Sequence, residues 1–322
     1  MKRLLLLLIF SSCVLSQDYS YIWGMHFPKL VDPSEDCCFD YDNDLTLDDG
    51  LGDILLSNQG NSNFQASIDL ALLNNEIIKV FDWQNLDLNL STQNFDFGIL
   101  DAKTLTPTFS LTDRMSGLTQ LYLPITTTTN IFTAQLNNNT VSATATAISG
   151  LLNLQFDTNQ GLTPLTLTDV KVEAQLSLNP ANVEAGIYTD DMTATAPAIV
   201  GGMKIGGILS SDEFLGVLDT EYRNCQCAGV DSSQPFITTS IGFGFIIVNC
   251  PQSNSITPAN CPVNSFCSTA GDFCTNAALL GTTFDIDTDN DNIKDAYSVA
   301  LRYGAAATTI VNIIFINGFE TQ

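Results

Sequence analysis

Apolar and polar residues alternate one by one along several stretches of this chain, and this two-residue period limits the fold more than any other feature. In the clearest stretch, from Val170 to Leu178, valine, alanine and leucine alternate with lysine, glutamate, glutamine and serine. Successive side chains of a strand point to opposite faces, so the stretch predicts a strand with one buried and one wet face. Similar rows predict strands at 86–90, 152–156, 241–247 and 297–303.

Turn and helix signals divide these strands. Val141–Ile148 alternates in the same way and then meets Ser149-Gly150, which predicts a hairpin turn toward the row at 152–156. Capping-box patterns at Ser62-x-x-Gln65 and Ser210-x-x-Glu213 predict two short helices. The glycines just before the second box, at 201, 202, 206 and 207, predict a flexible turn into that helix.

The order of these elements gives the fold class. Strands do not alternate regularly with helices, so a parallel sheet of Rossmann type is not expected. We predict an all-β fold, mainly an antiparallel sandwich or a strongly curved sheet, with two short helices and a disulfide-rich insertion at about 223–280. The predicted division is a segment 17–60, which carries an Asp-rich loop, and a β-rich domain 61–322.

The N-terminus has the layout of a secretory signal peptide over residues 1–16. A basic start, Lys2-Arg3, precedes an unbroken apolar run from Leu4 to Phe10 and then small residues. Cleavage after Ser16 is the favoured interpretation. The alternative is a lipobox ending at Cys13, which would give a lipid anchor. No other stretch approaches the roughly 20 apolar residues of a membrane-spanning helix, so no transmembrane span is predicted. The expected location is outside the cell, at the cell surface or in the periplasm.

The cysteine count agrees with export. Beyond Cys13, eight cysteines remain, an even number that favours disulfides in an oxidising compartment. Six of them fall between Cys225 and Cys274, in a stretch rich in Ser, Asn, Pro and Gly. Covalent closure stabilises such a loop-rich stretch most, and the sequence leaves the pairing open. A bond between the adjacent Cys37 and Cys38 would be strained, so different partners are expected for these two.

Charge and composition exclude several classes of function. The 322 residues carry 11 Lys and Arg against 35 Asp and Glu, a formal charge of −24. This balance argues against nucleic-acid binding and against a polybasic contact with anionic lipid. The chain has one histidine, His26, so His-rich metal sites are not expected and no catalytic residues stand out. Enzyme activity is left undecided, with a non-enzymatic role favoured.

Two aspartate-rich loops carry the clearest chemical signal. Both read D-x-D-N-D-x-x-x-D, one starting at Asp40 and the other at Asp287. Alternate side chains of a tightly wound loop can turn toward one point and offer oxygen ligands, which calcium prefers. The predicted ligands are the side chains of Asp40, Asp42, Asp44, Asp48, Asp287, Asp289, Asp291 and Asp295 and the carbonyls of Thr46 and Ile293.

The spacing resembles the calcium loops of EF-hand, dockerin and type-3 thrombospondin repeats, with two departures. The twelfth position, a bidentate Glu in an EF-hand, is Leu51 in one loop and Ser298 in the other. The sixth, usually Gly, is Leu45 and Asn292. Asp285 could supplement the second loop, and Asp49 or Asp53 the first. The resemblance implies weak, structural calcium binding.

The whole chain loosely resembles uncharacterised secreted bacterial β-rich proteins with Asp-rich calcium loops. That resemblance supplies no biochemical function. The sequence favours an exported, calcium-stabilised, disulfide-bonded β protein that acts by structure or binding through an extracellular or cell-surface partner. One alternative is a carrier of an apolar, lipid-like ligand held among the Leu, Ile and Phe rows. Another is a carbohydrate-binding protein or carbohydrate-active enzyme, a fold-level analogy.

Overall fold

A computed structural model describes residues 18–26, 38–52, 79–87, 90–104, 121–124, 130–138, 140–155, 162–175, 184–185, 203–263 and 265–310. Several predictions fall outside these residues. They are the signal peptide, Cys37, the supplementary ligand Asp53, the helix at Ser62, the strand positions 88, 89, 156 and 176–178, and the glycines at 201 and 202.

The described chain forms one large sheet and one small one, and both are mainly antiparallel. The large sheet consists of β1 (Asp18–His26), β2 (Lys79–Gln84), β3 (Thr92–Thr104), β4 (Leu121–Pro124), β5 (Asn130–Asn137), β6 (Thr140–Gln155), β7 (Leu162–Gln175), β8 (Glu184–Ala185), β9 (Met203–Ser210) and β12 (Ala296–Ile310). The small sheet pairs β10 (Thr238–Gly242) with β11 (Phe245–Asn249). The predicted fold class is confirmed.

The large sheet curves until it closes on itself. Its antiparallel pairings run β1-β2-β3-β5-β6-β7-β9-β12, and β12 pairs with β1 again. The short β4 joins β3 to β12, running parallel to β12, and β8 adds a short pairing to β12. Closure leaves none of the eight strands in the ring as an open edge over its paired length.

The alternating rows place apolar side chains inside this ring. On β7, Val170, Val172 and Ala174 are buried as predicted, and on β12 Tyr297 and Val299 are fully buried. Aromatic side chains from β2, β3 and β5 fill the described interior at one end. Here Phe97 and Phe132 stack with ring centroids 4.4 Å apart. The described part of the interior is therefore packed by its own side chains.

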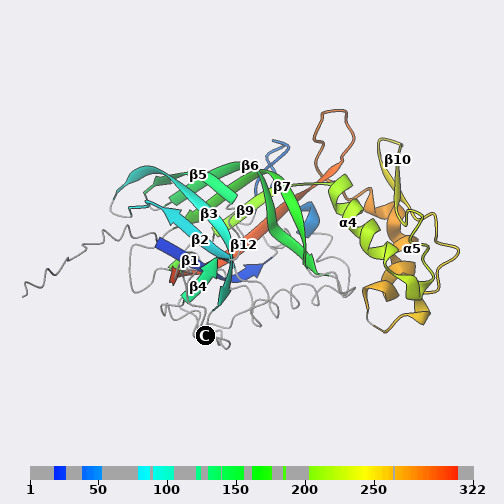
Figure 1. Ribbon diagram of the computed structural model, residues 1–322. Coiled ribbons are helices and arrows are strands. Elements are labelled where there is room, and N and C mark those ends of the chain that lie inside the picture. Colours follow the sequence, from blue (N-terminus) through cyan, green and yellow to red (C-terminus); the bar gives the residue numbers. More distant parts are fainter. Residues whose placement is uncertain are drawn as a thin grey trace, which may run out of the picture.

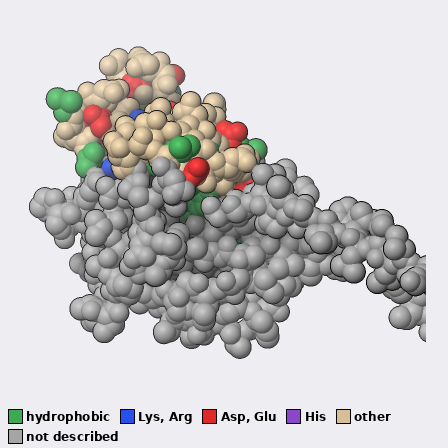
Figure 2. All heavy atoms as spheres, turned by 90° about the vertical axis from the view of Figure 1, so that its left-hand side faces the viewer, with side chains coloured by type: hydrophobic (Ala, Val, Ile, Leu, Met, Phe, Trp, Pro, Cys, Tyr) green, Lys and Arg blue, Asp and Glu red, His purple; other side chains and the backbone are tan. Residues whose placement is uncertain are grey.

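The outer face of the ring is mainly polar. Along β5 and β6 the residues between the buried ones are largely Thr, Gln, Asn and Ser, and they are mostly exposed. Figure 2 shows that, on the face it displays, the described acidic side chains are scattered through this polar surface and do not form one patch.

Four predicted local structures are wrong, and two of them concern turns in the large sheet. Ser149-Gly150 is not a hairpin turn, because β6 continues through these two residues and forms a bulge where it pairs with β7. Gly150, at φ 75°, lets the strand bend without ending. The row at 86–90 is not a strand in its described part, which forms the turn between β2 and β3. The Gln93 side chain fixes that turn, because its Nε2 donates a hydrogen bond to Asn85 O and its Oε1 accepts one from Asp87 N.

The row at 241–247 also differs from the prediction. It is two strands, because Phe243 (φ 56°) and Gly244 (φ 82°) form a tight turn between β10 and β11. The positive φ angles at these two residues therefore end β10 and start β11, although the alternation of apolar residues continues through the turn.

The glycines before the second helix have another role than the predicted turn. Gly206 and Gly207 lie inside β9. A Cβ on Gly206 would stand 2.5 Å from Phe39 Cδ2 and 2.7 Å from Tyr41 Oη. Glycine is needed here because the segment with the first Asp loop packs directly on the strand backbone.

The cysteine-rich part forms a lobe at one end of the sheet (Figure 1). It contains α4 (Ser211–Arg223), α5 (Ala270–Leu280) and the single-turn helices η2 (Gln226–Ala228), η3 (Pro258–Asn260) and η4 (Phe266–Thr269). The Ser210 side chain caps α4 as predicted, accepting a hydrogen bond from Glu213 N at 3.2 Å. No pattern in the sequence predicted α5.

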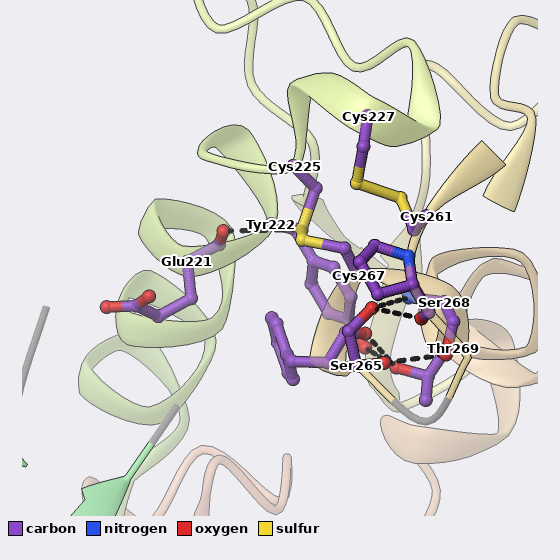
Figure 3. Close-up of a disulfide and its surroundings, with 11 residues drawn as sticks. Glu221, Tyr222, Cys225, Cys227, Cys261, Ser265, Cys267, Ser268 and Thr269 are labelled. Atoms are coloured by element: carbon purple, nitrogen blue, oxygen red, sulfur yellow. Dashed lines mark hydrogen bonds between the residues drawn. A yellow bond between two sulfur atoms is a disulfide. The ribbon is translucent and has the colours of Figure 1, made fainter. Parts of the chain in front are cut away.

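Three disulfides hold this lobe together, as the even cysteine count predicted. They join Cys225 to Cys267, Cys227 to Cys261 and Cys250 to Cys274. Figure 3 shows the first two lying side by side at the end of α4. Cys38 is also disulfide-bonded, and its partner lies outside the described residues.

Tyr222 is the centre of the lobe's aromatic core. Its ring lies 4.3 Å from that of Phe266 and 4.7 Å from that of Phe236. Burial raises the pKa of Tyr222 to about 12, and its hydroxyl pairs with Thr269 Oγ1 at 3.2 Å. The lobe also packs on the sheet, because Phe214 of α4 meets Tyr297 of β12 edge to face at 5.6 Å. In the part of the chain that the structure describes, no helix is long and apolar enough to cross a membrane.

Candidate metal centre

The two Asp-rich loops have the same backbone hydrogen bonds. Counting Asp40 and Asp287 as position one, the N–H groups of positions two, five, six, seven and nine are bonded to equivalent acceptors. In the first loop the bonds run from Tyr41 N to Asp48, Asp44 N to Asp42, Leu45 N to Asp40, Thr46 N to Asp44 and Asp48 N to Phe39 O. In the second they run from Thr288 N to Asp295, Asp291 N to Asp289, Asn292 N to Asp287, Ile293 N to Asp291 and Asp295 N to Ile286 O.

The backbone dihedral angles match as well. Asn43 and Asn290, at position four, have φ 61° and 63°. Leu45 and Asn292, at position six, have φ 72° and 70°. The same short sequence therefore folds into the same loop at two places in the chain, although their sixth residues differ.

Three carboxylates converge in each loop. Asp40, Asp42 and Asp48 each offer an oxygen, and these lie within 4.8 Å of one another. Asp287, Asp289 and Asp291 do the same in the second loop. Asp44 and Asp295 stand outside these groups of three, and the ligand roles of the Thr46 and Ile293 carbonyls stay predictions. Each group offers oxygen only, which fits a hard cation.

Asp285 and Asp49, which we predicted as supplementary ligands, form hydrogen bonds with the backbone. The carboxylate of Asp285 accepts hydrogen bonds from Gly50 N at 3.2 Å and Ser298 N at 2.8 Å. That of Asp49 accepts from Ala300 N at 3.1 Å. Both side chains thus tie the end of the first loop to β12. At position twelve, Leu51 and Ser298 are buried.

The two loops lie against each other, although 287 − 40 = 247 positions separate their starts. Phe39 and Tyr41 from the first loop form one apolar cluster with Ile286 and Ala296, which flank the second. This cluster sits on the outer face of β9 and β12. Figure 1 shows the chain of the first loop, in blue, beside the orange loop that leads into β12.

Two lysines hold the first loop on the sheet. Lys171 Nζ lies 4.2 Å from the centre of the Tyr41 ring, and Lys204 Nζ lies 5.0 Å from that of Phe39. Such cation–π contacts are worth about 0.5–1 kcal/mol at exposed sites and more when desolvated. Lys204 also pairs with Glu173 at 2.9 Å. These lysines, with Gly206 and Asp285, position the loop, and no pattern in the sequence marks them for that role.

Burial and neighbouring negative charges raise the pKa of several carboxylates in and beside the loops. Desolvation raises the pKa of Asp48, and the nearby charges of Asp42 and Asp285 add to the effect. Desolvation likewise raises the pKa of Asp285. The pKa of Asp289 is raised by desolvation and by the neighbouring Asp291, Asp287 and Asp295. Negative charge is therefore unfavourable at these groups unless a cation compensates it.

Leu45 is a strained position that one substitution relieves. Its φ of 72° is unfavourable for a residue with a Cβ, and its side chain is 93% exposed, so truncation loses no packing. We expect Leu45→Gly to raise the free energy of unfolding by about 0.5–1 kcal/mol in urea titrations. Leu47→Gly, at a position of ordinary φ, is the control and should lower it. An equal loss from both variants would contradict the strain.

The single histidine stands apart from both loops. His26 lies on β1 opposite Arg302 of β12.

No protein-family model matches this sequence, and neither a curated protein nor a solved structure matches it. The function must therefore be argued from the two loops and their surroundings.

Proposed function

We propose that this chain is an exported, disulfide-bonded β protein that calcium stabilises, with a structural or binding role at or outside the cell surface. The observation that carries the proposal is the common backbone of two acidic loops that pack against each other. Two separate segments adopting one backbone, each with three carboxylates converging, is what a pair of ion sites requires.

The chemistry of the donors favours calcium over softer metals. Every converging group is a carboxylate, and neither loop contains His or Cys. Zinc and copper prefer nitrogen and sulfur ligands, whereas calcium takes six to eight oxygens in a flexible arrangement. Lys294 is the one basic residue within the second loop, and its charge acts on Asp44 of the first loop. A divalent ion would relieve the remaining repulsion.

The disulfides support the proposed compartment. Bonds of this kind persist in oxidising compartments and are rare in reducing ones. Three of them in one lobe support an extracytoplasmic location, and the signal-peptide pattern agrees with it. Calcium is abundant enough outside cells to fill weak sites, which fits a stabilising role.

Calcium should raise the thermal stability of the protein. With dissociation constants of about 10⁻⁴–10⁻³ M, a calcium concentration of about 10 mM should add about 1.4–2.7 kcal/mol per site. The melting temperature should then rise by about 3–8 °C. We would measure it by calorimetry in EDTA and in calcium, and quantify bound metal in the same samples.

Two variants and a second ion make this test specific. Asp287→Asn and Asp40→Asn each remove one converging carboxylate, so each should remove part of the shift. Magnesium at the same concentration should give a smaller shift, because it demands stricter octahedral geometry. A melting temperature that calcium leaves unchanged, with no bound metal, would reject the proposal.

The pH dependence of stability should change sign with calcium. Without it, Asp48, Asp285 and Asp289 bind protons more readily folded than unfolded, since their folded pKa values are raised. Stability should therefore rise as the pH falls from neutral toward the ordinary Asp value of 3.8. The lowered pKa values of Asp44 and Asp231 act below that window.

With calcium the carboxylates of Asp48 and Asp289, which belong to the converging groups, are held charged, so protons compete with the ion and stability should fall over that range. Urea titrations at several pH values, with calcium and with EDTA, give both slopes. Parallel slopes in the two conditions would mean that these carboxylates do not bind the ion.

A further inference from the structure

The outer edge of β10 is open within the described residues, where β10 pairs only with β11. Gly242 and Phe245 close the two-residue turn and exchange hydrogen bonds across it. The N–H and C=O groups of Thr239 and Ile241 consequently point to the open edge. Natural edge strands are usually blunted by charged residues or proline. Thr238–Gly242 contains neither, in a chain of charge −24.

A cavity of about 420 Å³ adjoins β10, between the hairpin, α4 and the second Asp loop, whose Lys294 bridges to Phe245 of β11. Its walls come from three separate parts of the chain: β10 and β11, the first turn of α4, and the second Asp loop. Asp212, Asp289, Asp291 and Asp295 supply four carboxylates to the lining. Ile241, Ile246 and Ile293 supply apolar surface between them. Among the described residues, none of the four carboxylates forms an ion pair.

The tip of the hairpin adds exposed apolar surface. Ile241 is 70% exposed and Phe243 is 96% exposed. Phe243 also holds a left-handed backbone, φ 56°, where Asn or Gly would cost less. Folding alone does not favour a large aromatic residue at this position.

From these features we infer that β10 binds an extended segment of a basic polypeptide, which pairs with the strand edge and places a Lys or Arg side chain in the acidic cavity. Main-chain hydrogen bonds to Thr239 and Ile241 give affinity, and the alternate side chains of the added strand give specificity. The carboxylates select the positive charge, and the isoleucines contact the aliphatic stem of that side chain. Calcium in the second loop would leave the lining acidic, since Asp212 and Asp295 stay outside its converging group.

Fluorescence anisotropy with a labelled synthetic peptide, in which Arg and Val alternate, tests this inference on the full disulfide-bonded chain. We expect saturable binding that weakens as salt is raised. The same peptide with Glu in place of Arg should not bind. Methylation of alternate peptide N–H groups should weaken binding about tenfold, because it removes the main-chain donors without altering the protein.

Two matched protein variants test the cavity. Asp212→Asn should weaken peptide binding about threefold. Asp272→Asn changes the same kind of residue in the first turn of α5, away from the cavity, and should have no effect. Ile241→Pro removes an outward N–H and should also weaken binding.

Four results would overturn the inference. They are equal binding of the Arg and Glu peptides, undiminished binding of the methylated peptide, self-association in light scattering that Ile241→Pro abolishes, and attachment to phosphatidylcholine vesicles with no affinity for the peptide. The third would make a second copy of this chain the occupant, and the fourth a lipid surface. Each measurement is repeated in EDTA, so a failure of calcium binding is seen separately.

Discussion

Replacing Cys225 and Cys267 together by alanine should lower the free energy of unfolding by about 4 kcal/mol. The bond closes a loop with a sequence separation of 42, and loop-closure entropy alone accounts for a loss of this size. The pair is also buried beside the aromatic core around Tyr222, so truncation removes packing as well. Chemical denaturation of the double variant gives the value, and removing both cysteines avoids an unpaired thiol.

The matched control removes the disulfide between Cys250 and Cys274. This disulfide closes a loop with a shorter sequence separation of 24, and both of its cysteines are only partly buried. The free energy of unfolding should therefore fall by about 3.4 kcal/mol or less. Because Phe214 and Phe284 pack against Tyr297, lobe and sheet should still unfold in one transition in both variants. A larger loss in the control, or a separate transition for the lobe, would contradict this arrangement.

Phe97→Ala should cost about 3–5 kcal/mol, the range found for deleting a buried aromatic side chain. Phe97 is fully buried inside the ring, with Phe132 at 4.4 Å and Trp83 at 5.1 Å between ring centroids. No neighbour can move to fill the space without giving up its own contacts. The variant is measured by urea titration.

Phe97→Leu, which keeps most of the volume, should cost less than half as much. Benzene should partly restore the stability of Phe97→Ala by entering the dry cavity. A loss below about 1 kcal/mol in Phe97→Ala would mean that this interior is loosely filled, and it would favour the alternative of an apolar-ligand carrier.

Much of the fold was predictable where the signal is local. The alternation at Val170–Ala174 and Tyr297–Leu301 places buried residues correctly, because the strand period depends only on neighbours in the chain. The cap at Ser210 is equally local. Both Asp loops could be found because their hydrogen bonds lie within nine residues.

The predictions that failed concern features that depend on backbone conformation or on residues distant in the sequence. Nothing in the row 241–247 indicates that Phe243 adopts a positive φ, and nothing near Gly206 indicates that Phe39 will lie on it. Disulfide pairing, ring closure and the contact between the two loops join residues that lie far apart in the sequence. They are decided by which surfaces meet in the folded chain, and a single sequence does not display those surfaces.

The pairing of β1 with β12, which closes the ring of strands, affects the order in which the chain folds. Tyr19 pairs with Thr308, a separation of 308 − 19 = 289 residues. Contacts this remote are slow to form, because the loop they close must lose its entropy first. The sheet therefore cannot close until β12 has been made. For the exported protein that we propose, this late closure would let the polypeptide cross a membrane before it reaches its final shape.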